Sequence, residues 1–210
     1  MSTTMAPPDA NTGSKQSARV SQKIQKLREL YADAPPIGKA ALENGLAMLT
    51  EALAAPPREE TAGRIGLRQG KVSELCVFLP FVEGGATRLR GFLQLLEGNF
   101  RAADAVGTVH DMRFVFIDND KTLLFATAYD GDFDLYIDDF AAKIPNAMDL
   151  WLSNCEGYPG MKSGKAKEWI FNHQVQAEAW YVNSPNLTAA ETRKLERVGK
   201  AVDEFLDKIG

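Results

Sequence analysis

The chain is poor in the residues that most often build reactive or metal-binding sites. Its 210 residues include two cysteines and two histidines. Cys76 and Cys155 do not form a C-x-x-C pair, so the sequence indicates neither a zinc ribbon nor a disulfide framework, and we expect two reduced thiols. The sequence also lacks the G-x-S-x-G, H-E-x-x-H and P-loop motifs. The usual sequence support for hydrolases, zinc proteases and nucleotide-dependent enzymes is therefore missing.

The sequence also lacks an excess of positive charge and any long apolar run. It has 24 Lys and Arg against 28 Asp and Glu, which gives a net charge of -4. Nucleic-acid binders need a broad basic surface, so we do not expect a nucleic-acid partner. No run approaches the roughly 20 apolar residues of a membrane span, and residues 1 to 14 lack the apolar core of a secretory signal. We therefore expect a cytoplasmic protein with no membrane partner.

The sequence of residues 1 to 57 predicts a flexible tail followed by a helical hairpin. Residues 1 to 16 are polar and contain too little apolar surface to order themselves, so we expect a flexible tail. Residues 17 to 57 carry two apolar stripes at helical spacing, separated at Pro36 and ended at Pro57. The stripe residues are Val20, Ile24, Leu27 and Tyr31, then Leu42, Leu46, Leu49 and Leu53.

Residues 73 to 210 predict an α+β domain. Between residues 73 and 154 the patterns follow the order strand, helix, strand, strand, helix, strand, which is the βαββαβ order of a ferredoxin-like sandwich. Such a sheet leaves one face without its own helices, and we expect a second copy to cover that face in a homodimer. The predicted strands are Glu74–Phe81, Gly107–Asp118, Lys121–Tyr129 and Ala147–Asn154, and the second helix begins near Asp132.

The C-terminal part predicts one more strand and a helix. Residues 176 to 182 (QAEAWYV) have the composition of a fifth strand. Thr188 and Glu191 have the spacing of a capping box and mark the start of the closing helix. The helix carries an apolar stripe on one face, formed by Leu195, Val198, Val202, Phe205, Leu206 and Ile209.

Two polar residues in the second predicted strand are candidates for a catalytic role. His110 alternates onto the same predicted face as Met112 and Phe114, where a histidine is either packed with one hydrogen bond or catalytic. Arg113 lies on the other face among apolar residues, and a buried guanidinium needs a carboxylate or a bound anion. Asp111 can supply the carboxylate in a structural ion pair. The functional alternative is an arginine that positions an anion or a peroxide in a cavity.

The second histidine, His173, lies among aromatic residues, after Trp169 and before Trp180. A haem-ligating histidine commonly lies beside an aromatic-lined cavity. An ordinary histidine at a helix C-terminus has the same setting, since the helix dipole favours it there. Both interpretations stay open from the residues alone.

Several motifs carry a resemblance to a group of bacterial proteins. The passages VHDMRFVFIDNDKTLLFATAYDGDFDLYIDDF, LWLSNCEGYPG and NHQVQAEAWY resemble segments of poorly characterised proteins that are described as peroxidase- or catalase-related. Their ferredoxin-like core is similar to that of the α+β-barrel superfamily, which includes dye-decolourising peroxidases. The resemblance covers roughly residues 73 to 183. On matching positions it implicates His110, Arg113, Asp130, Gly131 and His173.

The resemblance implies an oxidoreductase-like protein that binds a planar apolar cofactor, haem, and acts on peroxide or a small organic substrate. In this interpretation His173 is the metal ligand and Trp180 contacts the cofactor, while Arg113, His110 and Asp130 are catalytic. The alternative is a non-catalytic binding or assembly protein that uses the open sheet face and the helical hairpin. A third hypothesis is a cofactor-free monooxygenase or isomerase that uses a sheet cavity alone.

Overall fold

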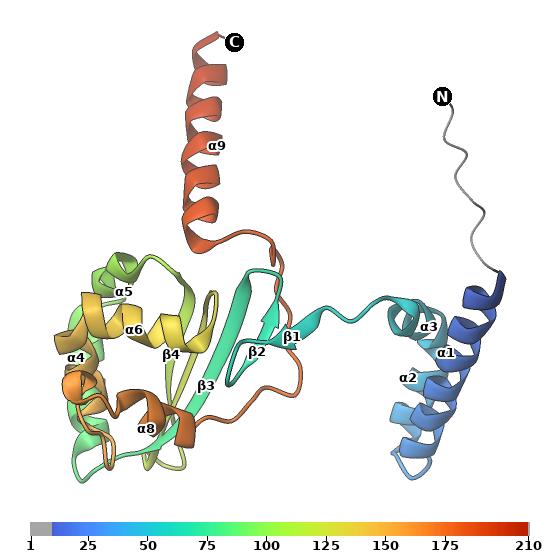
Figure 1. Ribbon diagram of the computed structural model, residues 1–210, viewed down its shortest axis with the longest axis horizontal. Coiled ribbons are helices and arrows are strands. Elements are labelled where there is room, and N and C mark those ends of the chain that lie inside the picture. The colour runs from blue at the N-terminus through green and yellow to red at the C-terminus, as the bar shows by residue number, and fades with distance from the viewer. Residues whose placement is uncertain (1–9, 210) are drawn as a thin grey trace. The chain divides into compact units, whose positions relative to one another are not determined.

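The computed structural model describes residues 10 to 209 of the chain (Figure 1). These residues belong to two compact units, of which the first ends at Pro57 and the second begins at Arg58. Residues 1 to 9 of the predicted flexible tail lie outside the described residues. The remainder of that predicted tail is helical instead, since the first helix, α1, spans Ala10–Leu30.

The first unit consists of α1, α2 (Pro36–Asn44) and α3 (Leu46–Ala54). Pro36 stands at the start of α2, where its missing N–H costs no hydrogen bond. The second arm of the predicted hairpin is divided into two helices at Gly45. Val20 and Leu42 are buried, and Arg28 pairs with Glu43 at 2.8 Å. Buried apolar side chains and a surface ion pair therefore contribute to holding the unit together.

The second unit contains an open, antiparallel, five-stranded sheet with the order β1-β2-β3-β5-β4. The long central strands pair over their whole length, and the predicted hairpin of β4 and β5 is confirmed. Its turn has positive φ angles at Asp118, Asn119 and Asp120, residue types that tolerate this conformation. The strands are β1 (Glu59–Thr61), β2 (Leu67–Gln69), β3 (Val72–Pro80), β4 (Val109–Ile117) and β5 (Thr122–Asp130).

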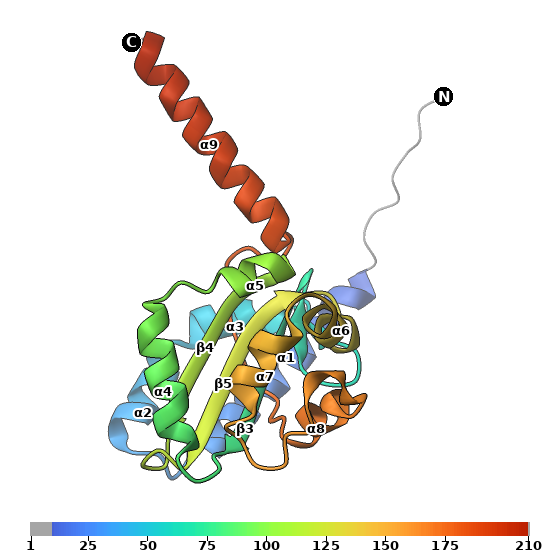
Figure 2. The same cartoon turned by 90° about the vertical axis from the view of Figure 1, so that its left-hand side faces the viewer.

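Helices cover one face of this sheet, and the core lies between them. In Figure 2, α4 lies in front of β4 and α7 in front of β5. The predicted inner face of the second helix is confirmed, because Phe133, Ile137 and Phe140 of α6 are buried in this core. The helices of the unit are α4 (Gly85–Leu96), α5 (Arg101–Val106), α6 (Phe133–Lys143), α7 (Pro145–Leu152), α8 (Ala166–Asn172) and α9 (Ala189–Ile209), with a 3₁₀ turn, η1, at Met161–Ser163.

The predicted fourth strand is wrong, because residues 145 to 152 form helix α7. Pro145 stands in the first turn of the helix, and Met148, Trp151 and Leu152 are its buried residues. Their spacing of three and four residues places them on one helical face, whereas a half-buried strand needs alternation. The predicted βαββαβ order therefore fails at its last element, while the α+β class is confirmed.

The predicted fifth strand at residues 176 to 182 is also absent, because the hydrogen-bonding groups along the free edge of β3 are already paired with other segments. Hydrogen-bonding positions along this edge are used by β2 near Ser73 and by the chain at His173 and Val175. At the C-terminal end of β3, Glu156 N–H donates to the Pro80 carbonyl, and just beyond it the Asn154 carbonyl accepts from Val82 N–H. Residues 176 to 182 form no ladder with the sheet, and the side chain of Gln69 in β2 donates to the Trp180 carbonyl at 2.8 Å.

The described residues include no helix that is both long enough and apolar enough to cross a membrane.

Candidate functional site

Two of the predicted site residues, His110 and Asp130, meet at the start of β4. His110 Nε2 donates to Asp130 Oδ1 at 2.7 Å, and the two side chains are 19% and 13% exposed. The β4–β5 register shifts between Val109 and Asp111, so His110 occupies a β-bulge. A bulge redirects a side chain, and the predicted face of His110 is therefore wrong: Val109 joins Met112 against the core, while His110 turns to Asp130.

Asp130 also holds the beginning of α9. The backbone N–H of Ala189 donates to Asp130 Oδ2 at 3.0 Å, and Ala189 is buried. A carboxylate at a helix N-terminus satisfies a free N–H and is favoured by the helix dipole. The carboxylate of Asp130 thus joins β4, β5 and α9 through two donors from distant parts of the sequence.

The predicted capping box is confirmed and adds a second connection to the sheet. Glu191 N–H donates to Thr188 Oγ1 at 3.1 Å, and Thr188 N–H donates to Glu191 Oε2 at 2.7 Å. Lys71, next to the start of β3, pairs with the same carboxylate at 2.8 Å. The hydrogen bond from Lys71, followed by the one from Thr188 N–H, lowers the pKa of Glu191 to about 2.

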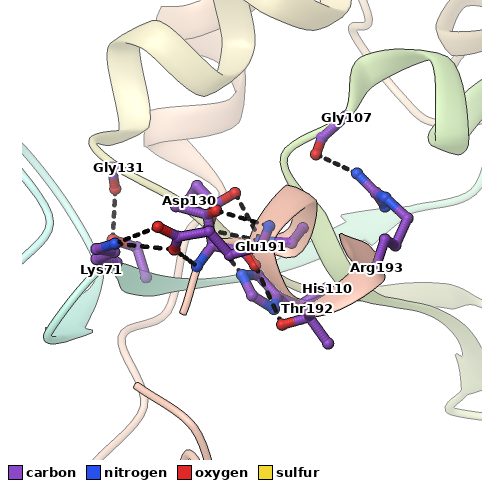
Figure 3. A network of polar contacts seen from close by, with 11 residues as sticks. Lys71, Gly107, His110, Asp130, Gly131, Glu191, Thr192 and Arg193 are labelled. Atoms are coloured by element: carbon purple, nitrogen blue, oxygen red, sulfur yellow. Dashed lines mark hydrogen bonds and ion pairs between the residues drawn. The ribbon is translucent and has the colours of Figure 1, made fainter. Parts of the chain in front are cut away.

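A third connection comes from Arg193, whose guanidinium donates to the carbonyl of Gly107 before β4. We call Lys71, His110, Asp130, Glu191 and Arg193 the helix anchor. Figure 3 shows these residues together around the first turn of α9. The anchor combines one partly buried hydrogen bond between side chains, one surface ion pair and two hydrogen bonds to backbone groups. It therefore fixes where α9 begins and how it leaves the sheet.

A shallow hollow of about 240 Å³ adjoins His110. It lies between α5 and the start of β4 and is lined by backbone and side chains from Gly98, Phe100, Ala103, Asp104 and residues 109 to 112. Within the described residues, the hydrogen-bond partner of the His110 side chain is the Asp130 carboxylate. The hydrogen bond to Asp130 orients the imidazole of His110, but the same carboxylate also accepts from the Ala189 N–H at the start of α9.

Arg113 lies apart from this cluster and is not buried, contrary to expectation. Its side chain is 64% exposed and pairs with Asp111 at 2.9 Å. Since β4 is the last strand of the sheet, this face is open at its edge. Of the two interpretations in the sequence, the geometry matches the intramolecular ion pair.

His173 lies at the opposite edge of the three long strands from Arg113. It caps the C-terminus of α8, where Nδ1 donates to the Trp169 carbonyl at 2.7 Å. Its own carbonyl accepts from Phe78 of β3, so β3 and β5 separate it from β4. The structure therefore does not bring His173 and Arg113 to a common space.

The space between sheet and helices does not fit the planar cofactor expected there. Side chains of β3, β5 and the three helices α6, α7 and α8 fill it and leave a hollow of only about 10 Å³. Small-molecule sites usually measure ~300–1,000 Å³. Among residues 10 to 209, no three His, Cys, Asp or Glu side chains group as metal ligands.

Both cysteines are free, as expected. Cys155 is buried, and this burial raises the pKa of its thiol to about 12. Cys76 is half-buried, and burial raises its thiol pKa as well. Neither thiol is in the electropositive setting that makes a cysteine reactive.

The feature that the site prediction missed is the bare face of α9 beyond the anchor. The six stripe residues predicted from the sequence (Leu195, Val198, Val202, Phe205, Leu206 and Ile209) are between 48% and 65% exposed. Figure 1 shows that only the first turn of α9 is next to the sheet. The sequence contains this signal as an amphipathic helix, whereas the predicted fold places the exposed apolar surface on the sheet.

Comparison with known proteins adds no relative: no family model, curated protein or solved structure matches the chain. The resemblance to peroxidase-related proteins stays a prediction.

Proposed function

We propose that this protein is a non-catalytic assembly module that binds another protein helix through the apolar stripe of α9. The observation that carries the proposal is an exposed row of six apolar side chains on a helix whose first turn is anchored to the sheet. Contiguous exposed apolar surface of this kind marks an interaction site in a folded protein.

The length of the free part of α9 supports the same conclusion. Beyond the anchor, the helix runs from Leu195 to Ile209. Isolated helices of ~12–15 residues are marginal in water, because most helix stability in proteins comes from packing an apolar face. A partner that covers the stripe supplies that packing.

The polar face of α9 favours a protein over a lipid surface. Membrane-surface helices are rich in Lys and Arg on the polar face. Here acidic and basic residues are interspersed: Lys194, Glu196, Arg197, Lys200, Asp203, Glu204, Asp207 and Lys208. This mixed face resembles the solvated side of a helix that packs against another helix.

The arrangement of the candidate catalytic residues supports a non-catalytic role. An enzyme of the expected kind needs a histidine and Arg113 facing one cavity. Arg113 is instead exposed in an ion pair with Asp111, and the carboxylate beside His110 holds α9. The charged pair on β4 also makes the open sheet face a poorer docking surface than the stripe.

The proposal keeps two finer expectations from the sequence. We propose a cytoplasmic location, and a ferredoxin-like arrangement for the portion from β3 to α6. The order β3-β5-β4, with α4 after β3 and α6 after β5, supports that arrangement.

The test is site-specific photo-crosslinking in cells that produce the full chain. A photoreactive side chain replaces Val198 on the stripe or, as the matched control, Lys200 on the polar face of the same helix. We expect an intermolecular product from position 198 and none from position 200, because only the stripe contacts a partner. Mass spectrometry of the product identifies the crosslinked peptide.

Two results would contradict the proposal. One is equal crosslinking at both positions, which would show non-specific contact. The other is a product with the mass of a single chain, in which position 198 joins only to the same molecule. That result would show that the stripe packs back onto its own sheet unit.

A further inference from the structure

We infer that the partner helix is α9 of a second copy of this chain, and that the two helices form a parallel, in-register, two-stranded coiled coil. The inference rests on the proposed function and specifies its partner. It differs from the dimer expected from the sequence, in which two sheet faces meet.

The stripe has the spacing of a coiled coil. From Leu195 to Ile209 the apolar residues follow at intervals of three, four, three and four, which is a heptad pattern. Leu195, Val202 and Ile209 take the a positions, and Val198 and Phe205 take the d positions. A paired segment of this length extends ~21 Å at 1.5 Å per residue.

The anchor leaves this stripe accessible to a second helix. Ala189 is buried against the sheet unit and Arg193 bonds to Gly107. At 3.6 residues per turn these two positions lie on the side of the helix opposite the stripe. Glu191, which pairs with Lys71, lies on the stripe side but one turn before Leu195. The stripe is therefore free of these contacts from Leu195 onward, and the contacts give both copies the same starting point at Ala189.

The flanking charges distinguish the two orientations. Residues beside the apolar seam set coiled-coil orientation through their charges. With the assignment above, Lys194 and Lys208 both fall at g positions. An antiparallel pair places Lys194 of one copy beside Lys208 of the other, twice per dimer, which is repulsive. A parallel pair places Lys194 beside Gly199 of the second copy and has no like-charge contact at these positions.

The sixth stripe residue, Leu206, agrees with the parallel orientation. It falls at an e position, next to the seam. In the parallel pair it lies beside Ala201 of the second copy, where a large apolar side chain meets a small one. In the antiparallel pair it lies beside Thr192, which has a hydroxyl. The parallel dimer therefore covers all six exposed apolar side chains with apolar or small neighbours.

The test uses single cysteines in the full-length chain under mild oxidation. The variants are Leu195→Cys and Phe205→Cys on the stripe, with Lys200→Cys on the polar face as the matched control. The wild-type chain is the blank, because burial raises the pKa of both native thiols. Disulfides need Cα atoms within ~7 Å of each other.

The parallel dimer predicts that Leu195→Cys and Phe205→Cys each form a covalent dimer alone, at least tenfold faster than Lys200→Cys. The antiparallel dimer places positions 195 of the two copies ~15 Å apart, at 1.5 Å for each of the intervening residues. It therefore predicts crosslinking only in a mixture of the two stripe variants, and that result would overturn the parallel inference.

The absence of crosslinks in every sample, including the mixture, would overturn pairing with a second copy. Photo-crosslinking from position 198 to a different protein would then leave the proposed assembly function standing. If neither experiment gave an intermolecular product, both the inference and the proposed function would fail. The two failures are therefore distinguishable.

Discussion

Helices α6 and α9 carry similar apolar patterns but have opposite surroundings. In α6, Phe133, Ile137 and Phe140 are at most 3% exposed and pack on the sheet. In α9, Val202 and Phe205 are 48% and 60% exposed. An amphipathic pattern thus predicts that one face of the helix is buried against a partner. It does not show whether that partner belongs to the same chain.

The comparison also shows two kinds of attachment. Helix α6 is held by its apolar face along its whole length, whereas α9 is held by polar contacts at its first turn. Apolar burial ties α6 to the folding of the whole unit. Polar contacts at one end fix the direction of α9 and leave its apolar face for another molecule.

The largest expected effect comes from truncating a matched phenylalanine in each helix. Phe140→Ala in α6 removes a fully buried ring, and we expect the free energy of unfolding to fall by about 3–5 kcal/mol. Phe205→Ala in α9 removes an exposed ring, and we expect a change within about 0.5 kcal/mol for the dissociated chain. Urea unfolding in dilute solution measures both. Equal losses from the two variants would show that α9 packs into the core of its own chain.

The next effect comes from the anchor. Asp130→Ala removes the acceptor of both His110 and the Ala189 N–H, and we expect a loss of about 1–3 kcal/mol. Hydrogen exchange should show the loss first at the amides of the first turn of α9. The control is Asp203→Ala on the exposed face of the same helix. Faster exchange at β5 with an unchanged first turn of α9 would contradict the role given to Asp130.

A smaller effect on stability is expected from replacing one glycine in α4 and one in α9. Gly91 in α4 and Gly199 in α9 both have space for a methyl group. Alanine at either position favours the helix by roughly 0.5–1 kcal/mol. We expect Gly91→Ala to raise the free energy of global unfolding, and Gly199→Ala to slow exchange only within α9. A rise in global stability from Gly199→Ala at dilution would mean that α9 unfolds together with the sheet.

The smallest effect is the acid dependence of the anchor. The pKa of Glu191 is lowered in the folded chain from 4.5 to about 2, mainly by Lys71. The contribution of its ionised form is present above pH 4.5 and disappears as the pH falls towards about 2, because protonation removes the carboxylate. Hydrogen exchange of the first turn of α9 across this range measures it. Glu191→Gln should remove this dependence, and an unchanged pH profile in that variant would assign it to another group.

The elements that the sequence predicted well are those whose local pattern and tertiary partner agree. The β4–β5 hairpin has a turn of Asp and Asn residues, and α6 has its stripe at helical spacing. The capping box of Thr188 and Glu191 needs only neighbours in the sequence. Local sequence signals were sufficient for these elements, because their structure depends mainly on residues that are close in the sequence.

The wrong predictions are of two kinds. In one, a short apolar segment fits both the strand period and the helix period. In the other, the direction or exposure of a side chain depends on neighbouring elements of the fold. Residues 147 to 154 were predicted as a strand, although Met148, Trp151 and Leu152 share a helical face. The bulge that turns His110 towards Asp130 has no signal in the alternation of β4. Likewise, Arg113 is exposed because it lies on the edge strand β4 and alternates with the core residues Met112 and Phe114, so it points to the other face. The sequence does not show which strand is at the edge.

Self-association through α9 is tested most directly by the mass of the full chain in solution, measured by sedimentation equilibrium over a range of concentrations. A dimer through α9 predicts a reversible rise from the 23.0 kDa of one chain to twice that value. In Val202→Asp, which places a charge in the stripe, the mass should stay at 23.0 kDa, whereas Lys200→Asp on the polar face should behave like the wild type. A wild-type mass of 23.0 kDa at every concentration would contradict self-association through α9.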